Sequence, residues 1–371
     1  MQKNNRRYDL DWWRVIAILA VFLHHVGMPF NGDDFHIMNA ESSKALDDIT
    51  VFFEQIRLPL LFLISGTGTV FAFSKRKWFQ FIGERSYRLL IPLFFGVVLI
   101  VPPQIYFENI QEYSSYFQLY PDALLHLKTN HLWFIENLFY ISIISIPIII
   151  LFKSKQSIGV KKLLDEIASR KYGLFLWVLP LLFIKIVSKD FYPSDSKDIT
   201  NLSSTFFFGY FFLTGILMTT TPNIWNHLKR HRKFNLRIAI ACIIIFYGYY
   251  FLPEEIASKV FSLKVRWIIW YLVTCLVSWS SIITLLGYGQ FWFNKSSPLL
   301  TKLNEAIYPF YILHQTVIVV LTFYIVKLNL PIFIKIPILL KSSLLIIIIL
   351  YRFLIYPFKL TRIIFGMKKN E

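Results

Sequence analysis

Ionisable side chains interrupt the first apolar stretch of the chain, and their spacing indicates proton chemistry. Asp11, Arg14 and the neighbours His24 and His25 stand in a segment that is otherwise apolar enough for a membrane-spanning helix. Imidazole is the side chain best suited to exchange a proton near neutral pH. On a helix, Arg14 and His25 lie about 20° apart around the axis and about 16 Å apart along it. One helix face therefore joins a cation to an imidazole.

The same geometry separates the two histidines. His24 lies about 80° from the line through Arg14, whereas Asp11 lies one turn below Arg14 and about 60° from it. The tryptophan pair between Asp11 and Arg14 is typical of a membrane interface, which puts His25 near the bilayer centre. The alternative is that Arg14 extends to the interface and both histidines only bond to neighbouring helices.

A second apolar stretch carries charges at its start and small residues further on. Glu54 and Arg57 are three residues apart and are predicted to pair on one helix. Residues 65–68 are small, and Pro59 precedes them, so close helix packing or a kink is expected there.

A pair of arginines precedes the third apolar stretch. Arg85 and Arg88 are one helical turn apart, just before residue 89. Such a pair suits the phosphates of a ligand that arrives from the cytosol. The alternative is that the two charges only set the topology of the chain.

The fourth and ninth apolar stretches also carry polar groups. His131, Trp133 and Glu136 open the fourth, and Glu136 is predicted to need a cationic partner. Tyr311 and His314 share a face in the ninth. The alternatives are an interfacial role for His131 and core hydrogen bonding for the pair in the ninth stretch.

These side chains need a bundle of membrane helices to position them. The 371 residues are 56% hydrophobic and only 16% charged, whereas a soluble domain is about 25% charged. The sequence predicts an all-α polytopic membrane bundle, a single domain over residues 1–371, with about ten spans. The predicted spans are residues 12–30, 51–73, 89–107, 131–152, 172–188, 203–219, 236–252, 264–287, 305–327 and 336–357.

Charge supports this topology and excludes other classes. With the N-terminus inside, most of the 39 Lys and Arg residues fall in inside segments, so both termini are predicted to be cytoplasmic. The outside loops hold Lys44, Lys128, Lys189, Lys197, Lys259 and Lys335. The net charge of +17 is thus explained without a nucleic-acid partner. We expect no cleavable signal peptide, no disulfide framework and no metal site.

Five segments resemble, in order, motifs of the acyltransferase-3 family of integral membrane acyltransferases. They are residues 11–14 followed by ten residues and then His25, and residues 57–66, 84–92, 131–134 and 308–315. Arg57 and the last segment are most similar to the branch that succinylates osmoregulated periplasmic glucans. The second segment departs from the pattern, because it continues with Gly66 to Gly68 where a bulkier apolar pair is more usual.

The resemblance implies transfer of an acetyl or succinyl group from cytoplasmic acyl-CoA to a hydroxyl of an extracytoplasmic or lipid-linked glycan, in the inner membrane. It implies that His25 acts as base or acyl carrier with Arg14, and that Arg85 and Arg88 hold the acyl-CoA. Acyl-CoA is expected as a co-substrate, and no cofactor as permanently bound. The supporting residues are Asp11, Glu54, Arg57, His131, Trp133, Glu136, Tyr311 and His314.

Two other classes explain part of the pattern. A proton-coupled transporter or flippase of a glycan or lipid precursor also needs buried histidines and charges. It predicts two related halves, and none are visible between residues 1–180 and 181–371. A membrane assembly factor without catalysis has no need for an arginine and a histidine on one helix face.

Overall fold

The computed structural model describes residues 6–367, which are helical without any β-strand, so the predicted all-α class is confirmed. Lys3, Lys368 and Lys369, which the charge argument counts on the inside, lie outside the described residues. Within the described part, eight helical segments are long and apolar enough to cross a membrane, or nine if one bent pair counts as a single span. The chain is therefore a multi-pass membrane protein.

Nine of the ten predicted spans match these segments, and the exception is residues 172–188. This region forms a 3-10 helix, η6 (Gly173–Trp177), followed by α11 (Val178–Phe191), which has only 14 residues. A membrane span takes roughly 20 residues, so α11 is too short by itself. The predicted number of spans is thus one higher than the nine counted among residues 6–367. The cytoplasmic position of both termini remains a prediction.

Contacts divide the chain into two compact units that alternate along the sequence. Unit 1 comprises Met1–Arg14, Gln55–Arg76 and Ile141–Ser296, and unit 2 comprises Val15–Glu54, Lys77–Tyr140 and Ser297–Glu371. The first helix, α1 (Tyr8–Asn31), begins in unit 1 and continues into unit 2 after Arg14.

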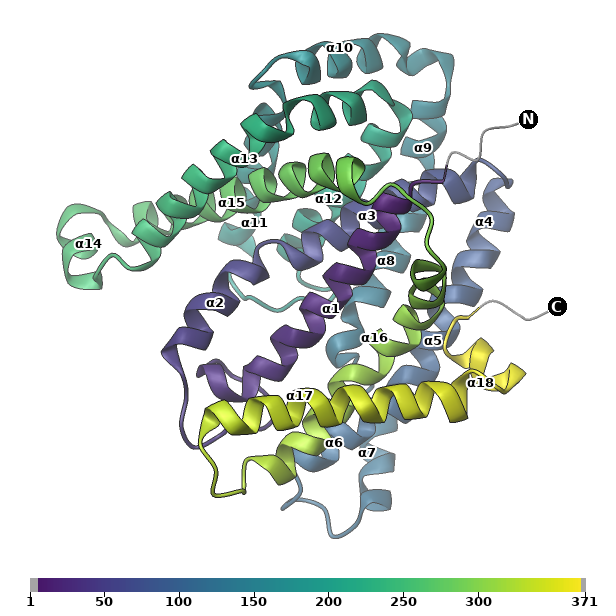
Figure 1. Ribbon diagram of the computed structural model, residues 1–371, viewed down its shortest axis with the longest axis vertical. Coiled ribbons are helices and arrows are strands. Elements are labelled where there is room, and N and C mark those ends of the chain that lie inside the picture. Colours follow the sequence, from purple (N-terminus) through teal and green to yellow (C-terminus); the bar gives the residue numbers. More distant parts are fainter. Residues whose placement is uncertain (1–5, 368–371) are drawn as a thin grey trace. The chain divides into compact units, whose positions relative to one another are not determined.

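Two closely packed helix pairs form most of unit 1. In Figure 1, α13 (Asn223–Tyr250) runs beside α15 (Leu263–Trp292), and α3 (Arg57–Phe73) packs on α12 (Leu202–Thr220). The remaining helices of unit 1, apart from η6 and α11, are α9 (Ile146–Lys153), η5 (Lys155–Ser157), α10 (Ile158–Ser169) and α14 (Glu254–Val260). α11 packs on both α12 and α15.

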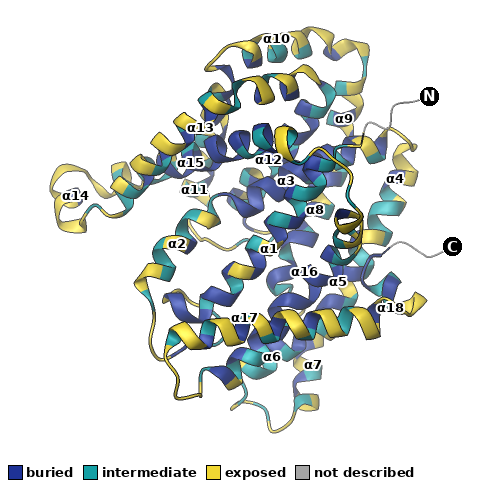
Figure 2. Cartoon of the chain, viewed as in Figure 1, coloured by how far each residue is buried: buried dark blue, intermediate teal, exposed yellow. Residues whose placement is uncertain are grey.

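Small residues allow α3 and α12 to approach closely. A Cβ atom on Gly66 would lie 2.0 Å from the carbonyl oxygen of Phe212, and one on Gly215 would lie 2.1 Å from that of Leu63. Thr67 donates a hydrogen bond to the carbonyl of Gly215 at 3.3 Å. The prediction of close packing at residues 65–68 is thus confirmed, and α3 is largely buried in Figure 2.

Unit 2 is organised around α16 (Pro298–Ile325), which contacts α17 (Ile332–Ile349) and α6 (Pro102–Glu108). Its other α-helices are α2 (Lys44–Glu54), α4 (Trp78–Arg85), α5 (Ile91–Phe95), α7 (Leu119–Leu125), α8 (Trp133–Ile144) and α18 (Lys359–Ile364). Its shorter helices are η1 (Ser86–Leu90), η2 (Gly96–Ile100), η3 (Tyr116–Gln118), η4 (Asn130–Leu132) and η7 (Leu350–Ile355).

Prolines explain why two predicted spans are not regular helices. The predicted span 51–73 is divided into α2 and α3, because Pro59 in the first turn of α3 has no N–H to donate to the carbonyl of Gln55. Glu54 ends α2 and Arg57 begins α3, and the pairing of these two residues stays a prediction. In the third span, Pro92 follows the π-helix η1, and Pro102 follows the π-helix η2.

Candidate active site

Four histidines gather in unit 2, and we call them the histidine cluster: His25, His36, His131 and His314. The ring centroid of His314 lies 5.2 Å from that of His25 and 5.2 Å from that of His131. The Phe35 ring lies 6.0 Å from His25 and 5.1 Å from His36. The cluster thus joins residues of α1, of the loop after it, of η4 and of α16.

Helix α16 fixes His314 in a buried position. Residues 309–315 of this helix are all buried, and His314 is only 1% exposed. Its Nδ1 bonds to the carbonyl of Tyr311. Its Nε2 makes no hydrogen bond to any residue between 6 and 367. His314 therefore has one ring nitrogen held by its own helix and one that can take up a further polar contact.

His131 also contacts helix α16. Its Nε2 lies 3.0 Å from the carbonyl oxygen of Ile312, and the Tyr311 hydroxyl donates to the His131 carbonyl. Asn130 adopts a positive φ of 42° immediately before it, a conformation that asparagine tolerates better than most residues. This turn directs the His131 side chain towards α16.

Glutamine side chains connect His131 with His36. The Gln104 amide nitrogen lies 3.3 Å from Nδ1 of His131, and its oxygen accepts from Gln315 at 3.2 Å. The Gln315 amide nitrogen also lies 2.9 Å from Nε2 of His36. His36 Nδ1 in turn lies 2.6 Å from a carboxylate oxygen of Glu108. The result is a continuous polar chain from a partly exposed carboxylate to a buried imidazole.

The polar chain uses residues that the sequence had not assigned to the site. Gln104 had a signal, because it is polar within the predicted span 89–107, and Gln315 lies within a family-like segment. His36 and Glu108 had no signal, because they lie in a predicted outside loop and at a span end, where polar residues are ordinary.

The predicted catalytic and supporting residues are divided between the units. The structure brings His25, His131, Tyr311 and His314 together in unit 2. Glu54 pairs with the buried His24 at 3.6 Å, which gives His24 the helix partner expected for it. Trp133 and Glu136 occupy the first turn of α8, both partly buried.

The residues near the start of α1 belong to unit 1. Arg14 Nη1 lies 3.3 Å from Oδ1 of Asp11, and the other carboxylate oxygen, Oδ2, accepts a hydrogen bond from Arg6 at 2.9 Å. The predicted proximity of Asp11 and Arg14 on one helix face is thus confirmed. Arg57 is buried in α3, at 4% exposure.

The predicted donor-binding arginines lie where the helix widens. Arg85 is the last residue of α4, with its guanidinium 5.1 Å from the Phe81 ring, and Arg88 is inside the π-helix η1. The Tyr308 hydroxyl donates to the Arg88 carbonyl at 3.3 Å, which connects η1 to α16. Arg88 also lies 3.7 Å from Glu84, and it remains exposed. Both guanidinium groups thus lie on the helix that precedes Pro92.

The cluster has no arrangement typical of a metal centre. Among residues 6–367, no group of three or more His, Cys, Asp or Glu side chains is placed to hold an ion. The centroid separations of about 5 Å between imidazoles suit ring packing and proton exchange through one intervening group.

Comparison with known proteins shows the family to which the chain belongs. A family model described as an acyltransferase domain matches residues 7–352, which is nearly the whole chain. The chain is 25% identical over 235 residues to glucans biosynthesis protein C of Salmonella schwarzengrund (strain CVM19633) and of Salmonella heidelberg (strain SL476). It is 25% identical over 232 residues to the protein of that name from Salmonella typhi. The match covers 59% of this chain and 60% of the length of these relatives. No solved structure matches the chain.

Proposed function

This chain belongs to the acyltransferase-3 family, and from that premise we propose that it is a membrane acyltransferase with His25 at its reaction centre. The proposed reaction moves an acetyl or succinyl group from cytoplasmic acyl-CoA to a hydroxyl of an extracytoplasmic or lipid-linked glycan. The proposed location is the inner membrane. The relatives' name, which refers to glucan biosynthesis, supports a glycan as acceptor.

The observation that carries the proposal is the position of His25 against His314. Two imidazoles whose centroids lie 5.2 Å apart form a group that can take and pass on a proton. In the proposed step, His25 removes the proton of the acceptor hydroxyl as its oxygen attacks the thioester carbonyl. The carbon–sulfur bond breaks, and the CoA thiolate leaves and is protonated. His25 as a transient acyl carrier is the variant of this step.

Arginines are proposed to hold the anionic donor. Arg85 and Arg88 are one turn apart, and guanidinium groups bind phosphate in a bidentate manner. Arg14 is proposed to assist near the thioester end of the donor. Acyl-CoA would be a co-substrate of this reaction, and no permanently bound cofactor is proposed.

The experiment that tests the function is a transfer assay in proteoliposomes. Labelled acetyl-CoA or succinyl-CoA is supplied on one side and a glucose oligomer on the other, and acylated oligomer is quantified by mass spectrometry. His25→Ala is expected to lower turnover by a factor of about 10² to 10⁴, because a general base contributes that much. The matched control is His126→Ala, since His126 is an exposed histidine outside the cluster.

Two results would contradict the proposal. Near-normal turnover in a folded His25→Ala protein would exclude the role of His25. Movement of the oligomer across the membrane without any acyl-CoA would favour the transporter class instead.

A further inference from the structure

A cavity in unit 1 lies between the end of α11 and the start of α15. Its volume is about 690 Å³, within the range of small-ligand sites. Aromatic rings on α15 form one wall, Lys185 and Lys189 of α11 form the other, and Asp190 and Asp195 also line it. The cavity belongs to unit 1, whereas the histidine cluster belongs to unit 2.

The aromatic wall presents flat apolar faces to the cavity. Trp267 and Tyr271 are one turn apart on α15, with ring centroids 6.0 Å apart and planes inclined by 29°. Trp267 is 50% exposed, and Trp270 lines the same cavity. Tryptophan and tyrosine combine an apolar face with a polar tip, which suits ligands that are apolar on one side and polar on the other.

Lys185 has donors to spare inside this cavity. Its ammonium group donates to Thr274 at 3.2 Å and lies 5.0 Å from the Phe207 ring and 5.6 Å from the Tyr271 ring. Lysine has three N–H donors, and among residues 6–367 no carboxylate forms an ion pair with Lys185. A cation with unused donors at the wall of a cavity points to a ligand that accepts hydrogen bonds.

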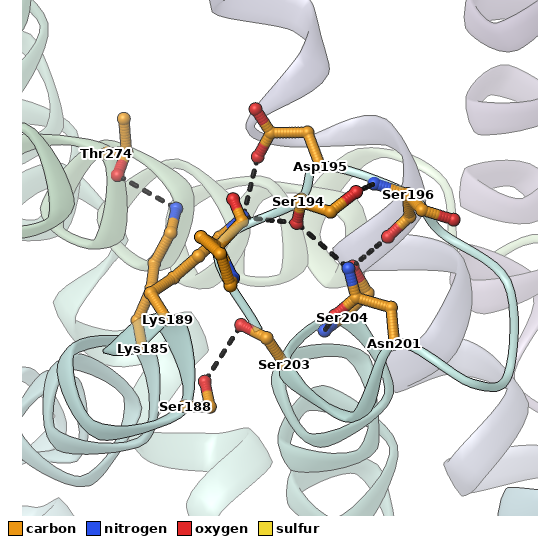
Figure 3. Close-up of polar contacts among 11 residues, drawn as sticks. Lys185, Ser188, Lys189, Ser194, Asp195, Ser196, Asn201, Ser203, Ser204 and Thr274 are labelled. Carbon is orange, nitrogen blue, oxygen red and sulfur yellow. Dashed lines mark hydrogen bonds and ion pairs between the residues drawn. The ribbon is translucent and has the colours of Figure 1, made fainter. Parts of the chain in front are cut away.

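The rim of the cavity is ordered by hydrogen bonds, as Figure 3 shows. Lys189 donates to the carbonyl of Ser194 at 2.7 Å and to Asp195 at 2.7 Å, and Asn201 donates to the same carbonyl at 2.9 Å. Asn201 also caps α12, because its side-chain oxygen accepts from the Ser204 backbone N–H. These hydrogen bonds tie the loop between α11 and α12 to both helices.

We infer that this cavity binds a carbohydrate segment, with sugar rings on the aromatic wall and hydroxyls at Lys185, Asp190 and Asp195. A sugar hydroxyl both donates and accepts, so it can use the ammonium and the carboxylates together. Lys264 also lines the cavity, so three lysines and two aspartates face it, and the two carboxylates need donors that sugar hydroxyls supply and an ionised phosphate lacks.

This inference rests on the proposed function only for the identity of the glycan as acceptor. A carbohydrate site accounts for two features that an interfacial anchoring role of Trp267 does not explain. A belt of tryptophans at the membrane surface accounts for an exposed Trp267, but it has no need for Lys185 inside a cavity or for an ordered rim.

Binding of glucose oligomers of two to six units to the full chain in lipid nanodiscs, measured by calorimetry, tests the inference. Trp267→Ala is expected to weaken binding about tenfold, which corresponds to about 1.4 kcal/mol, because it removes an aromatic face from the wall. Lys185→Met keeps the apolar stem and removes the donors, and is also expected to weaken binding. The matched control is Trp292→Ala, because Trp292 lies on the same helix and is similarly exposed, at 57%.

Three outcomes would overturn the inference. The first is equal binding in wild type and Trp267→Ala, or equal weakening by Trp292→Ala. The second is lower stability of Trp267→Ala in the bilayer with unchanged oligomer affinity, which would make Trp267 an interfacial anchor. The third is binding of inorganic phosphate that depends on Lys185 while oligomer binding does not.

The same measurement separates this inference from the proposed function. His25→Ala is expected to bind the oligomer as tightly as the wild type. If the wild-type protein binds the oligomer through Trp267 but has no transferase activity, the carbohydrate site is supported. The proposed transferase function is then contradicted. Transferase activity that is unaffected by Trp267→Ala at low oligomer concentration would contradict the site alone.

Discussion

His25 and His314 approach each other from α1 and α16, with 5.2 Å between their ring centroids. These histidines are 289 positions apart in the chain, and both lie in helices long and apolar enough to span a membrane. Inserting such polar side chains into a membrane costs free energy, and ionisable residues inside a span are therefore usually functional. The pair therefore connects the proposed base to a second group that can share its proton.

His314→Phe tests whether this second group takes part in turnover. The variant keeps a flat ring against Phe310, whose ring is stacked at 6.5 Å, but removes both nitrogens. We expect kcat to fall about 10²-fold with the KM of both substrates little changed. Steady-state assays over pH are the measurement. A pH profile of unchanged shape in the residual activity would make His314 a positioning residue, and an unchanged kcat would make it a packing residue only.

The donor site is tested at the arginines of the third span. Arg85→Ala and Arg88→Ala are each expected to raise the KM for acyl-CoA about tenfold, because hydrogen bonds to charged groups contribute roughly 1.5–3 kcal/mol. The expected change in kcat is small. Titration of acyl-CoA at constant acceptor gives both constants. The control is Lys77→Ala, an exposed cation just before α4. An equal effect at Lys77 would mean that the basic residues act only as general surface charge.

Two glycines of α3 form a matched pair for testing helix packing. A methyl group on Gly66 would meet the Phe212 carbonyl oxygen at 2.0 Å, whereas one on Gly68 would meet nothing within 4 Å. We expect Gly66→Ala to destabilise the protein by about 1–3 kcal/mol through overpacking. Gly68→Ala should be neutral. Thermal unfolding of the detergent-solubilised variants measures the difference, and equal melting of both variants would show that α3 and α12 do not pack as described.

The sequence predicted the features that depend on local spacing and composition. The approach of Asp11 to Arg14, the close packing at Gly66 and the all-α class follow from helix periodicity, small residues and apolar stretches. These need no knowledge of which helices are neighbours in space.

The features that were missed depend on contacts between distant segments or on backbone irregularity. The polar chain through Gln104 and His36 exists because α6, α16 and the loop after α1 meet, and periodicity does not reveal such neighbours. Arg88 lies in a π-helix, and α11 is short. Both are local departures from a long, regular α-helical hydrogen-bond pattern. A window of apolar residues cannot distinguish α11 from a full span.

Asp198 gives a test of the ordered rim through pH. Hydroxyl groups of Ser196 and Thr200 donate to its carboxylate, and these bonds hold the pKa of Asp198 below its ordinary value of 3.8. The ionised form thus stabilises the folded loop. This contribution is complete above pH 3.8 and is lost as the pH falls through the lower folded pKa.

The backbone amides of Thr200 and Asn201, which donate to Asp198, report on the loop. Corrected for intrinsic rates, their hydrogen-exchange protection should stay constant from about pH 5 to 8 and fall only below about pH 4. Asp198→Ala should remove the protection at every pH, whereas Asp34→Ala, an exposed aspartate of unit 2, should not change it. Loss of protection in the wild type near pH 6 would contradict a carboxylate that is stabilised in its charged form, and with it the ordered rim that the carbohydrate site requires.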